Sequence, residues 1–148
     1  MTTAHLSEVW RIEQLSGLKS TSAASREREL TNPNTLLLVA IKTDQTIGFI
    51  EASLITSAIE IINIAVLPLF RRQGIGDALW RKTIFLAREK GIAESWLEVR
   101  EHNAEALKFY QKRGYEIVGR RQNYYSNPTA DAILMTLTFL DGRLKECE

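Results

Sequence analysis

Hydrophobic residues at helical spacing open the chain. Leu6, Val9 and Trp10 follow Thr3, which we expect to be the N-cap of a first helix. Residues 20–30 form a second, more polar helical stretch, and the breaker Asn32-Pro33-Asn34 ends it. The pattern therefore predicts two helices before the first strand.

Three apolar, β-branched runs follow, at residues 36–42, 46–55 and 59–67. Each is separated from the next by only three residues, 43–45 and 56–58. Connections this short join antiparallel strands, because a parallel crossover needs about a dozen residues or more. The runs therefore predict an antiparallel meander.

Helices and strands alternate in the second half. After Pro68 we expect a helix that ends near Lys90 before Gly91, with a buried face made of Ile75, Ala78, Leu79 and Leu86. Next come a short strand (96–100), a helix (104–113) capped by Asn103 and closed by Gly114, and two strands near 115–119 and 132–139. The whole chain, 1–148, is expected to be one α/β domain, with a mixed sheet, antiparallel first and then parallel, between helices.

The composition argues against several classes of function. Nineteen basic and 18 acidic residues leave a net charge of +1, so no global field favours nucleic acid or an anionic membrane. No apolar run approaches the ~20 residues of a membrane span, and no signal-peptide pattern opens the chain, so we expect a cytoplasmic protein. The single cysteine, Cys147, is expected to be a tail residue, and with His5 and His102 it forms no cluster at metal-ligand spacing. We therefore expect no metal.

The most specific motif is a strand that runs straight into Arg71-Arg72-Gln73-Gly74-Ile75-Gly76 before a helix. Glycines at a helix N-terminus let backbone N–H groups approach an anion closely. Residues 71–90 carry six basic and two acidic side chains, a local excess of four positive charges. The spacing fits neither a nucleotide-triphosphatase phosphate loop nor a dinucleotide fingerprint. The motif predicts a site for a phosphorylated ligand; the alternative is a plain tight turn with solvated arginines.

These residues resemble the GNAT acetyltransferase superfamily. The resemblance is carried by residues 64–66, 71–76, 97–100, 103–106, 109–110 and 114–115. Two further strings, 120–125 and 131–133, are similar to the RimI family, which acetylates the N-terminal alanine of a small-subunit ribosomal protein. The resemblance implies the GNAT fold, acetyl-coenzyme A as co-substrate, and a primary amine as acceptor, most specifically the α-amine of a ribosomal protein.

The same resemblance implies the residues of the donor site. The coenzyme A pyrophosphate would be bound at Arg71, Arg72, Gln73, Gly74, Ile75, Gly76 and Asp77, mainly by backbone amides. The pantetheine arm would lie against Ile64, Ala65 and Val66, where one N–H would polarise the thioester carbonyl. Asn103 would bond the pantetheine, cap its helix, or do both.

Glu98 and Tyr110 are the candidate catalytic residues that the resemblance implies. Glu98 lies within Trp96-Leu97-Glu98-Val99, where it would face a largely apolar interior as general base; the alternative is an exposed glutamate paired with Arg100. Tyr110 would protonate the departing thiolate, and the alternative is a core aromatic beside Phe109. The implied mechanism is direct transfer, without a covalent enzyme intermediate.

The chain departs from the family pattern in three places. No strand pattern precedes the first helix, so we expect that edge strand to be short or missing. Residues 16–22 stand where RimI proteins carry an aromatic-proline-tryptophan segment, and the spacer 126–130 is short. Both segments lie near the acceptor in the family.

Two alternatives therefore stay open. One is a GNAT enzyme for a small amine, such as a polyamine, an aminoglycoside or an amino acid; a cleft lined by carboxylates would favour a polycation, and an open groove a peptide. The other is a non-catalytic acyl-coenzyme A-binding module, which would bind coenzyme A without turnover. The oligomeric state is left open as well.

Overall fold

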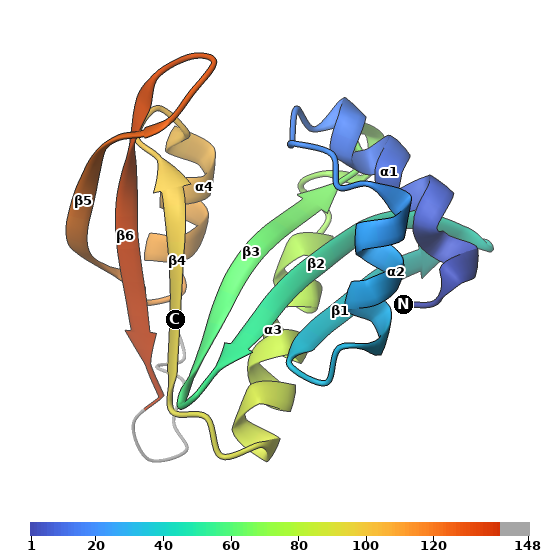
Figure 1. Ribbon diagram of the computed structural model, residues 1–148, viewed down its shortest axis with the longest axis horizontal. Helices are drawn as coiled ribbons and strands as arrows, with labels where there is room; N and C mark the ends of the chain where they lie inside the picture. The colour runs from blue at the N-terminus through green and yellow to red at the C-terminus, as the bar shows by residue number, and fades with distance from the viewer. Residues whose placement is uncertain (140–148) are drawn as a thin grey trace.

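The computed structural model, which describes residues 1–139, shows a six-stranded mixed sheet with helices on both faces (Figure 1). Its strands, in the order β1-β2-β3-β4-β6-β5, are β1 (Thr35–Lys42), β2 (Gln45–Ile55), β3 (Ala58–Val66), β4 (Glu94–Arg100), β5 (Glu116–Tyr125) and β6 (Ala130–Thr138). The predicted meander is confirmed, because β2 pairs antiparallel with both β1 and β3. β4 then pairs in parallel with β3, and β6 pairs antiparallel with β4 and β5. The predicted fold class is confirmed.

Two helices cover each face of the sheet. A 3₁₀ turn, η1 (Thr3–His5), leads into α1 (Leu6–Leu15), which lies with α2 (Ala23–Thr31) on one face. After a second 3₁₀ turn, η2 (Pro68–Phe70), α3 (Ile75–Glu89) lies on the other face with α4 (Ala104–Gln111) (Figure 1). Each face of the sheet has its own core: Val9 and Ile12 of α1 pack with Phe49 on one face, and Ile84 of α3 packs with Ile59 on the other.

Several element boundaries differ from the sequence prediction, among them those of the first turn, α2 and β5. The first turn is capped by Thr2 rather than Thr3, and the Thr2 N–H donates to His5 Nδ1 at 3.0 Å. α2 begins at Ala23, because the Ser22 side chain caps it by accepting the Ser25 N–H at 3.2 Å. β5 was expected to end at Gly119 but extends to Tyr125, which pairs with Ala130 of β6.

The buried face of α3 is also rotated from the expected one. Leu79, Trp80, Thr83, Ile84 and Ala87 are buried, whereas Ala78 is exposed. The Trp80 indole N–H donates to the Tyr115 hydroxyl at 3.2 Å, and Trp80 itself is buried. This contact turns the Trp80 side of the helix toward the core and leaves Ala78 in solvent.

Within the described residues no strand precedes α1, as the sequence indicated. The Met1 ammonium instead donates to the Leu37 carbonyl of the edge strand β1 at 3.1 Å. In residues 1–139, no helix is both long enough and apolar enough to cross a membrane. Cys147, for which a tail position was expected, lies outside the described residues.

The feature that positions the site is the short pairing of β3 with β4. Ala58–Ile61 pair with Glu94–Leu97, and beyond these residues the two strands diverge (Figure 1). A bulge at Ile62 accompanies the divergence, because Glu51 of β2 pairs with Asn63 while the next residue, Ala52, pairs with Ile61. The inner backbone edges of both strands are therefore unpaired toward their carboxyl ends.

Candidate active site

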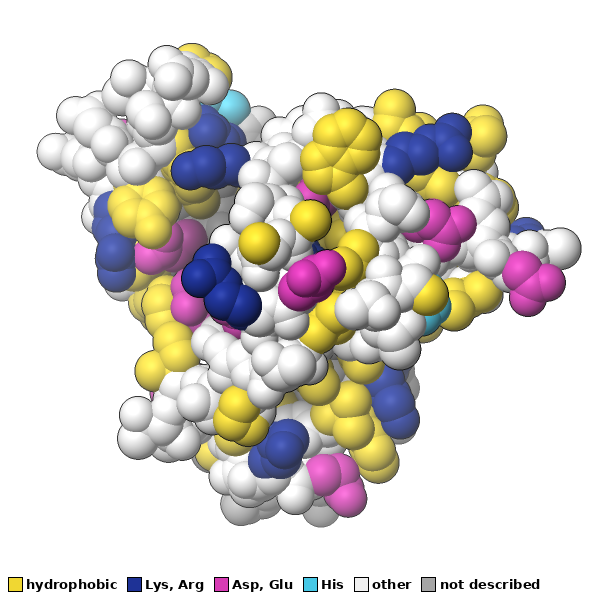
Figure 2. Space-filling model, turned by 45° about the vertical axis from the view of Figure 1, so that its right-hand side comes forward, with side chains coloured by type: hydrophobic (Ala, Val, Ile, Leu, Met, Phe, Trp, Pro, Cys, Tyr) yellow, Lys and Arg dark blue, Asp and Glu magenta, His cyan; other side chains and the backbone are white. Residues whose placement is uncertain are grey.

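A groove of about 2380 Å³ lies where β3 and β4 diverge. Residues 62–66 of β3 and 98–100 of β4 form its walls. The glycine turn, the start of α4, the α1–α2 loop (16–19) and the end of β5 with the residue that follows it (124–126) extend the groove. The surface is hollowed between the lobe at the upper left and the middle of the molecule, with basic side chains beside the hollow (Figure 2). A crevice beyond the carboxyl ends of diverging parallel strands is the usual ligand site of sheets with such strands.

The groove brings together almost all of the residues expected to form the site. It is lined by Ile64, Ala65, Val66, Arg71, Arg72, Gly74, Ile75, Gly76, Asp77, Glu98, Asn103 and Tyr110. Gln73 is the exception, because its side chain turns back and donates to the Leu69 carbonyl at 3.2 Å. Any contribution of Gln73 to ligand binding would therefore come from its backbone.

The turn before α3 has the backbone conformation of an anion cradle. Gly74, the N-cap of α3, has φ 81°, and Arg72 has φ 61°, both in the left-handed region. Left-handed residues in such turns let successive N–H groups converge on an anion. A Cβ on Gly76 would lie 3.4 Å from the Phe109 ring of α4, in van der Waals contact with it, so little space is left there for a longer side chain. The geometry agrees with the phosphorylated ligand expected from the sequence.

Charged side chains hold this turn in place. Arg71 Nε donates to the Val66 carbonyl at the end of β3 at 2.9 Å. Asp77, an acidic residue within the expected pyrophosphate site, pairs with Arg81 at 2.6 Å and with Arg113 at 2.8 Å. Burial alone would raise the pKa of Asp77, but the bonds from Arg81 and Arg113 outweigh burial and hold that pKa below its usual value. Two guanidinium groups thus neutralise the one carboxylate beside the cradle.

Asn103 caps α4, as the sequence predicted. Its Oδ1 accepts the Ala106 N–H at 3.1 Å. A contact between Asn103 and the pantetheine arm stays a prediction.

Tyr110 both packs in the core and lines the groove. Its ring is 5% exposed and lies edge-to-face with the rings of Phe109 and Tyr115, at centroid distances of 5.1 and 5.2 Å. Burial raises the pKa of Tyr110 well above its usual value, and the nearby Tyr115 raises it further. The hydroxyl therefore stays protonated near neutral pH, as a general acid must.

Glu98 does not face an apolar interior, and that expectation was wrong. Its carboxylate Oε1 lies 3.3 Å from Arg121 Nε, and it lies near the Tyr124 hydroxyl, whose pKa it raises. Both partners come from β5, two strands away, because their side chains reach across β6 to the face of β4 that carries Glu98. Arg100, the alternative partner, instead lies over the Tyr125 ring at 4.2 Å and donates to the Pro128 carbonyl at 3.2 Å.

Sequence reasoning missed the neighbours of Glu98. Arg121 and Tyr124 lie in the string 120–125, which the resemblance singled out without assigning a role to any residue in it. Had β5 been extended to Tyr125, strand alternation would have placed Arg121 on one face and Arg120 on the other. His102 is a different case: the sequence left it out of the site, and its side chain is 80% exposed.

The chain matches the Acetyltransferase (GNAT) family over residues 5–115. It belongs to the GNAT acetyltransferase family. The [ribosomal protein bS18]-alanine N-acetyltransferase of Haemophilus influenzae is 40% identical over 94 residues, so the match spans 64% of each chain. The Salmonella typhimurium protein of the same name is 34% identical over 146 residues, 93% of each chain. The crystal structure of the ribosomal-protein-S18-alanine N-acetyltransferase from Escherichia coli has a TM-score of 0.85 and 28% identity, over 98% of this chain and 94% of that one.

Family membership confirms the acetyltransferase class and the acetyl-coenzyme A co-substrate predicted from the sequence. A solved acetyltransferase structure from Bacillus anthracis, 29% identical with a TM-score of 0.69 over 74% of this GNAT chain and 65% of that one, holds acetyl-coenzyme A. Residues 1–139 contain no group of three or more His, Cys, Asp or Glu side chains able to hold a metal.

Proposed function

We propose that this GNAT protein transfers the acetyl group of acetyl-coenzyme A to the N-terminal α-amine of a protein, and that this protein is a ribosomal one, as in its relatives. The observation that carries the proposal is the groove between β3 and β4, with the glycine turn and Tyr110 along one part of its lining and Glu98 along another. A donor bound at the turn and an amine beside Glu98 would meet between the two strands.

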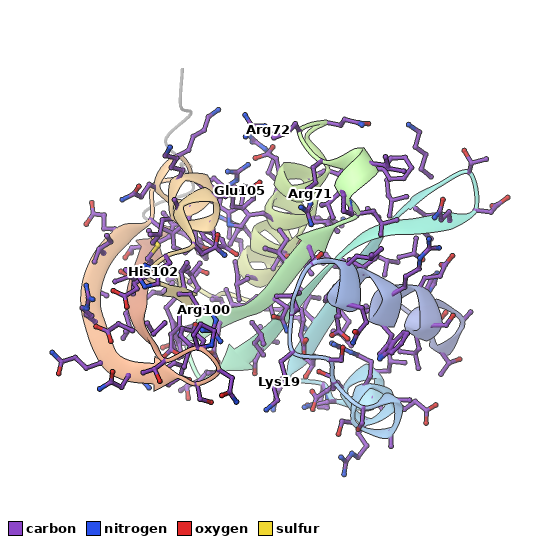
Figure 3. The ribbon with its side chains drawn as sticks, turned by 90° about the horizontal axis from the view of Figure 1, so that it is seen from above. Lys19, Arg71, Arg72, Arg100, His102 and Glu105 are labelled. Carbon is purple, nitrogen blue, oxygen red and sulfur yellow. The ribbon has the colours of Figure 1, made fainter. Side chains whose placement is uncertain are left out.

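The charges of the groove favour a peptide over a polyamine. Its lining includes nine basic side chains, Lys19, Arg71, Arg72, Arg81, Arg88, Arg100, Lys108, Lys112 and Arg113, and three acidic ones, Asp77, Glu98 and Glu105. Lys19 and Arg100 lie toward one end of the gap, and Arg71, Arg72 and Glu105 toward the other (Figure 3). Around Glu98 the lining therefore lacks the row of carboxylates that would bind a polycation, within the part of the chain that the structure describes.

In the proposed mechanism the residues of the groove move two protons. Glu98 takes a proton from the α-ammonium through a water, and the freed amine nitrogen attacks the thioester carbonyl carbon. A backbone N–H of residues 64–66 stabilises the developing oxyanion, and the carbon–sulfur bond breaks as Tyr110 gives its proton to the thiolate. The new amide nitrogen then loses its second proton, which returns through water to the Tyr110 oxygen, and Glu98 releases the first proton to solvent. An α-amine, with a pKa of ~8, suits this chemistry better than lysine at ~10.4, because less free energy is needed to deprotonate it near pH 7.

The test incubates the protein and acetyl-coenzyme A with each of three acceptors and detects the products by mass spectrometry. The acceptors are an alanine-start ribosomal peptide, the same peptide with a blocked N-terminus and a lysine, and spermidine. We expect one acetyl group on the free α-amine of the first peptide. Acetylation confined to spermidine or to the blocked peptide would overturn the assignment of the acceptor. Binding of coenzyme A without turnover on any of the three would overturn the enzymatic proposal in favour of a binding module.

A further inference from the structure

The proposed base already has a cationic partner before any acceptor arrives. Arg121 Nε lies 3.3 Å from Glu98 Oε1, and the Glu98 side chain is only 11% exposed. In the proposed mechanism the α-ammonium of an acceptor gives its proton to the same carboxylate through one water, so it must lie beside that carboxylate. Two cations beside one carboxylate repel each other, and the repulsion is stronger where the site is partly shielded from water.

Arg121 has room to move and a second carboxylate to move toward. Its side chain is 51% exposed. Glu60 of β3 pairs with Trp96 of β4, two residues before Glu98, so Glu60 and Glu98 lie on the same face of the sheet. Both neighbouring charges act on Glu60: burial and then the charge of Glu98 raise the pKa of Glu60, and Arg121 lowers it. Arg121 therefore interacts with two carboxylates on neighbouring strands, Glu98 by an ion pair and Glu60 through its charge.

We propose that Arg121 and the acceptor ammonium compete for Glu98. Arg121 is ion-paired with Glu98 in the acceptor-free enzyme, and its side chain shifts toward Glu60 when the acceptor binds. Arg121 and Glu60 are then positioning residues that act through Glu98, and the exchange adds a cost to acceptor binding. This inference rests on the proposed function, in which the amine approaches Glu98.

The experiment is a double-mutant cycle on the peptide KM at saturating acetyl-coenzyme A. Arg121→Gln removes the competing cation, so the KM for the alanine-start peptide should fall about two- to fivefold, the range of a partly exposed ion pair. Glu60→Gln removes the alternative partner, so Arg121 stays on Glu98 and KM should rise by a similar factor. In the Arg121→Gln background, the effect of Glu60→Gln should disappear.

Two further variants control for indirect effects. Arg120→Gln changes the neighbouring arginine, which is also ion-paired, to Glu101 and Asp131, and it should leave KM unchanged. Arg121→Lys keeps the charge and should keep a KM near that of the wild type. Thermal melts establish that each variant is folded.

The outcomes separate this inference from the proposed function. Wild-type turnover on the peptide tests the function, whereas the ratios of KM among the variants test the exchange. An active wild type with an unchanged or raised KM in Arg121→Gln overturns the exchange alone, as does a Glu60→Gln effect that persists without Arg121. A wild type that acetylates no α-amine overturns both.

Discussion

Replacing Arg26 with methionine should strongly destabilise the protein. Arg26 is 3% exposed and donates to Glu51 at 2.6 Å and to Glu13, which are themselves 7% and 1% exposed. Removing the cation leaves two buried carboxylates facing each other without the positive charge that both now contact. Breaking a buried ion pair by removing one member costs about 3–5 kcal/mol. We expect a loss of unfolding free energy in that range at pH 7.

The loss should depend on pH in a defined direction. Burial raises the pKa of Glu13 above its ordinary 4.5, and Arg26 partly opposes that rise. A carboxyl whose folded pKa is raised contributes stability that is present below the unfolded value and is lost as pH rises through the folded pKa. Without Arg26 the folded pKa of Glu13 rises further. The penalty of the substitution should therefore shrink as pH falls from 7 toward 4.5.

Urea unfolding followed by circular dichroism at pH 7 and pH 5 measures both effects. Arg28→Met is the matched control, because Arg28 lies two residues further along α2, is exposed, and donates to the Ser25 hydroxyl at 2.9 Å. It should cost less than about 0.5 kcal/mol. A loss below about 1 kcal/mol for Arg26→Met at pH 7, or a loss that grows as pH falls, would refute the reasoning.

The proposed site leads to three further predictions. Glu98→Gln should lower kcat ~10²- to 10⁴-fold without changing acetyl-coenzyme A affinity in calorimetry, and wild-type rates across pH would remove Glu98 from the mechanism. Tyr110→Phe should also lower kcat with little change in donor affinity; an unchanged rate in a folded variant would leave Tyr110 as a core aromatic alone. Gly74→Glu should weaken acetyl-coenzyme A binding, whereas Gly91→Glu, at a similar φ of 75° but outside the groove, should not; equal affinities would show that the turn does not bind the donor.

Local signals were enough to predict most of the fold. The three-residue breaks between apolar runs led directly to the β1–β3 meander, and Asn103 before an apolar helix led to the cap of α4. β5 was underestimated because residues 120–125 are polar and mostly exposed, so they lack the apolar alternation by which a strand is recognised. Their strand state comes from pairing with β6, which is a tertiary interaction.

The buried polar contacts were the least predictable part of the molecule. Trp80 and its partner Tyr115 are 35 residues apart in sequence, and their bond decides which side of α3 is buried. Likewise, the neighbours of Glu98 depend on the register of two strand pairs, because Leu134 of β6 pairs with Glu98 on one side and with Gly119 on the other. The polar residues 120–125 carry no apolar alternation that would show which residues of β6 they pair with. A shift of the pairing by one residue would turn each of their side chains to the opposite face of the sheet.

The divergence of β3 and β4 gives the sheet two edges inside the molecule. Edge strands are normally a hazard, because their free N–H and C=O groups can pair with any passing chain. Here these groups line a groove, so they can pair only with an extended molecule that lies along the strands. An amide-bearing cofactor arm or the start of a polypeptide has this form. Recognition by backbone groups does not depend on side-chain identity. The part of the groove nearest the reaction would therefore tolerate conservative substitutions at residues 62–66, while discrimination between acceptors would fall to the loops at its mouth.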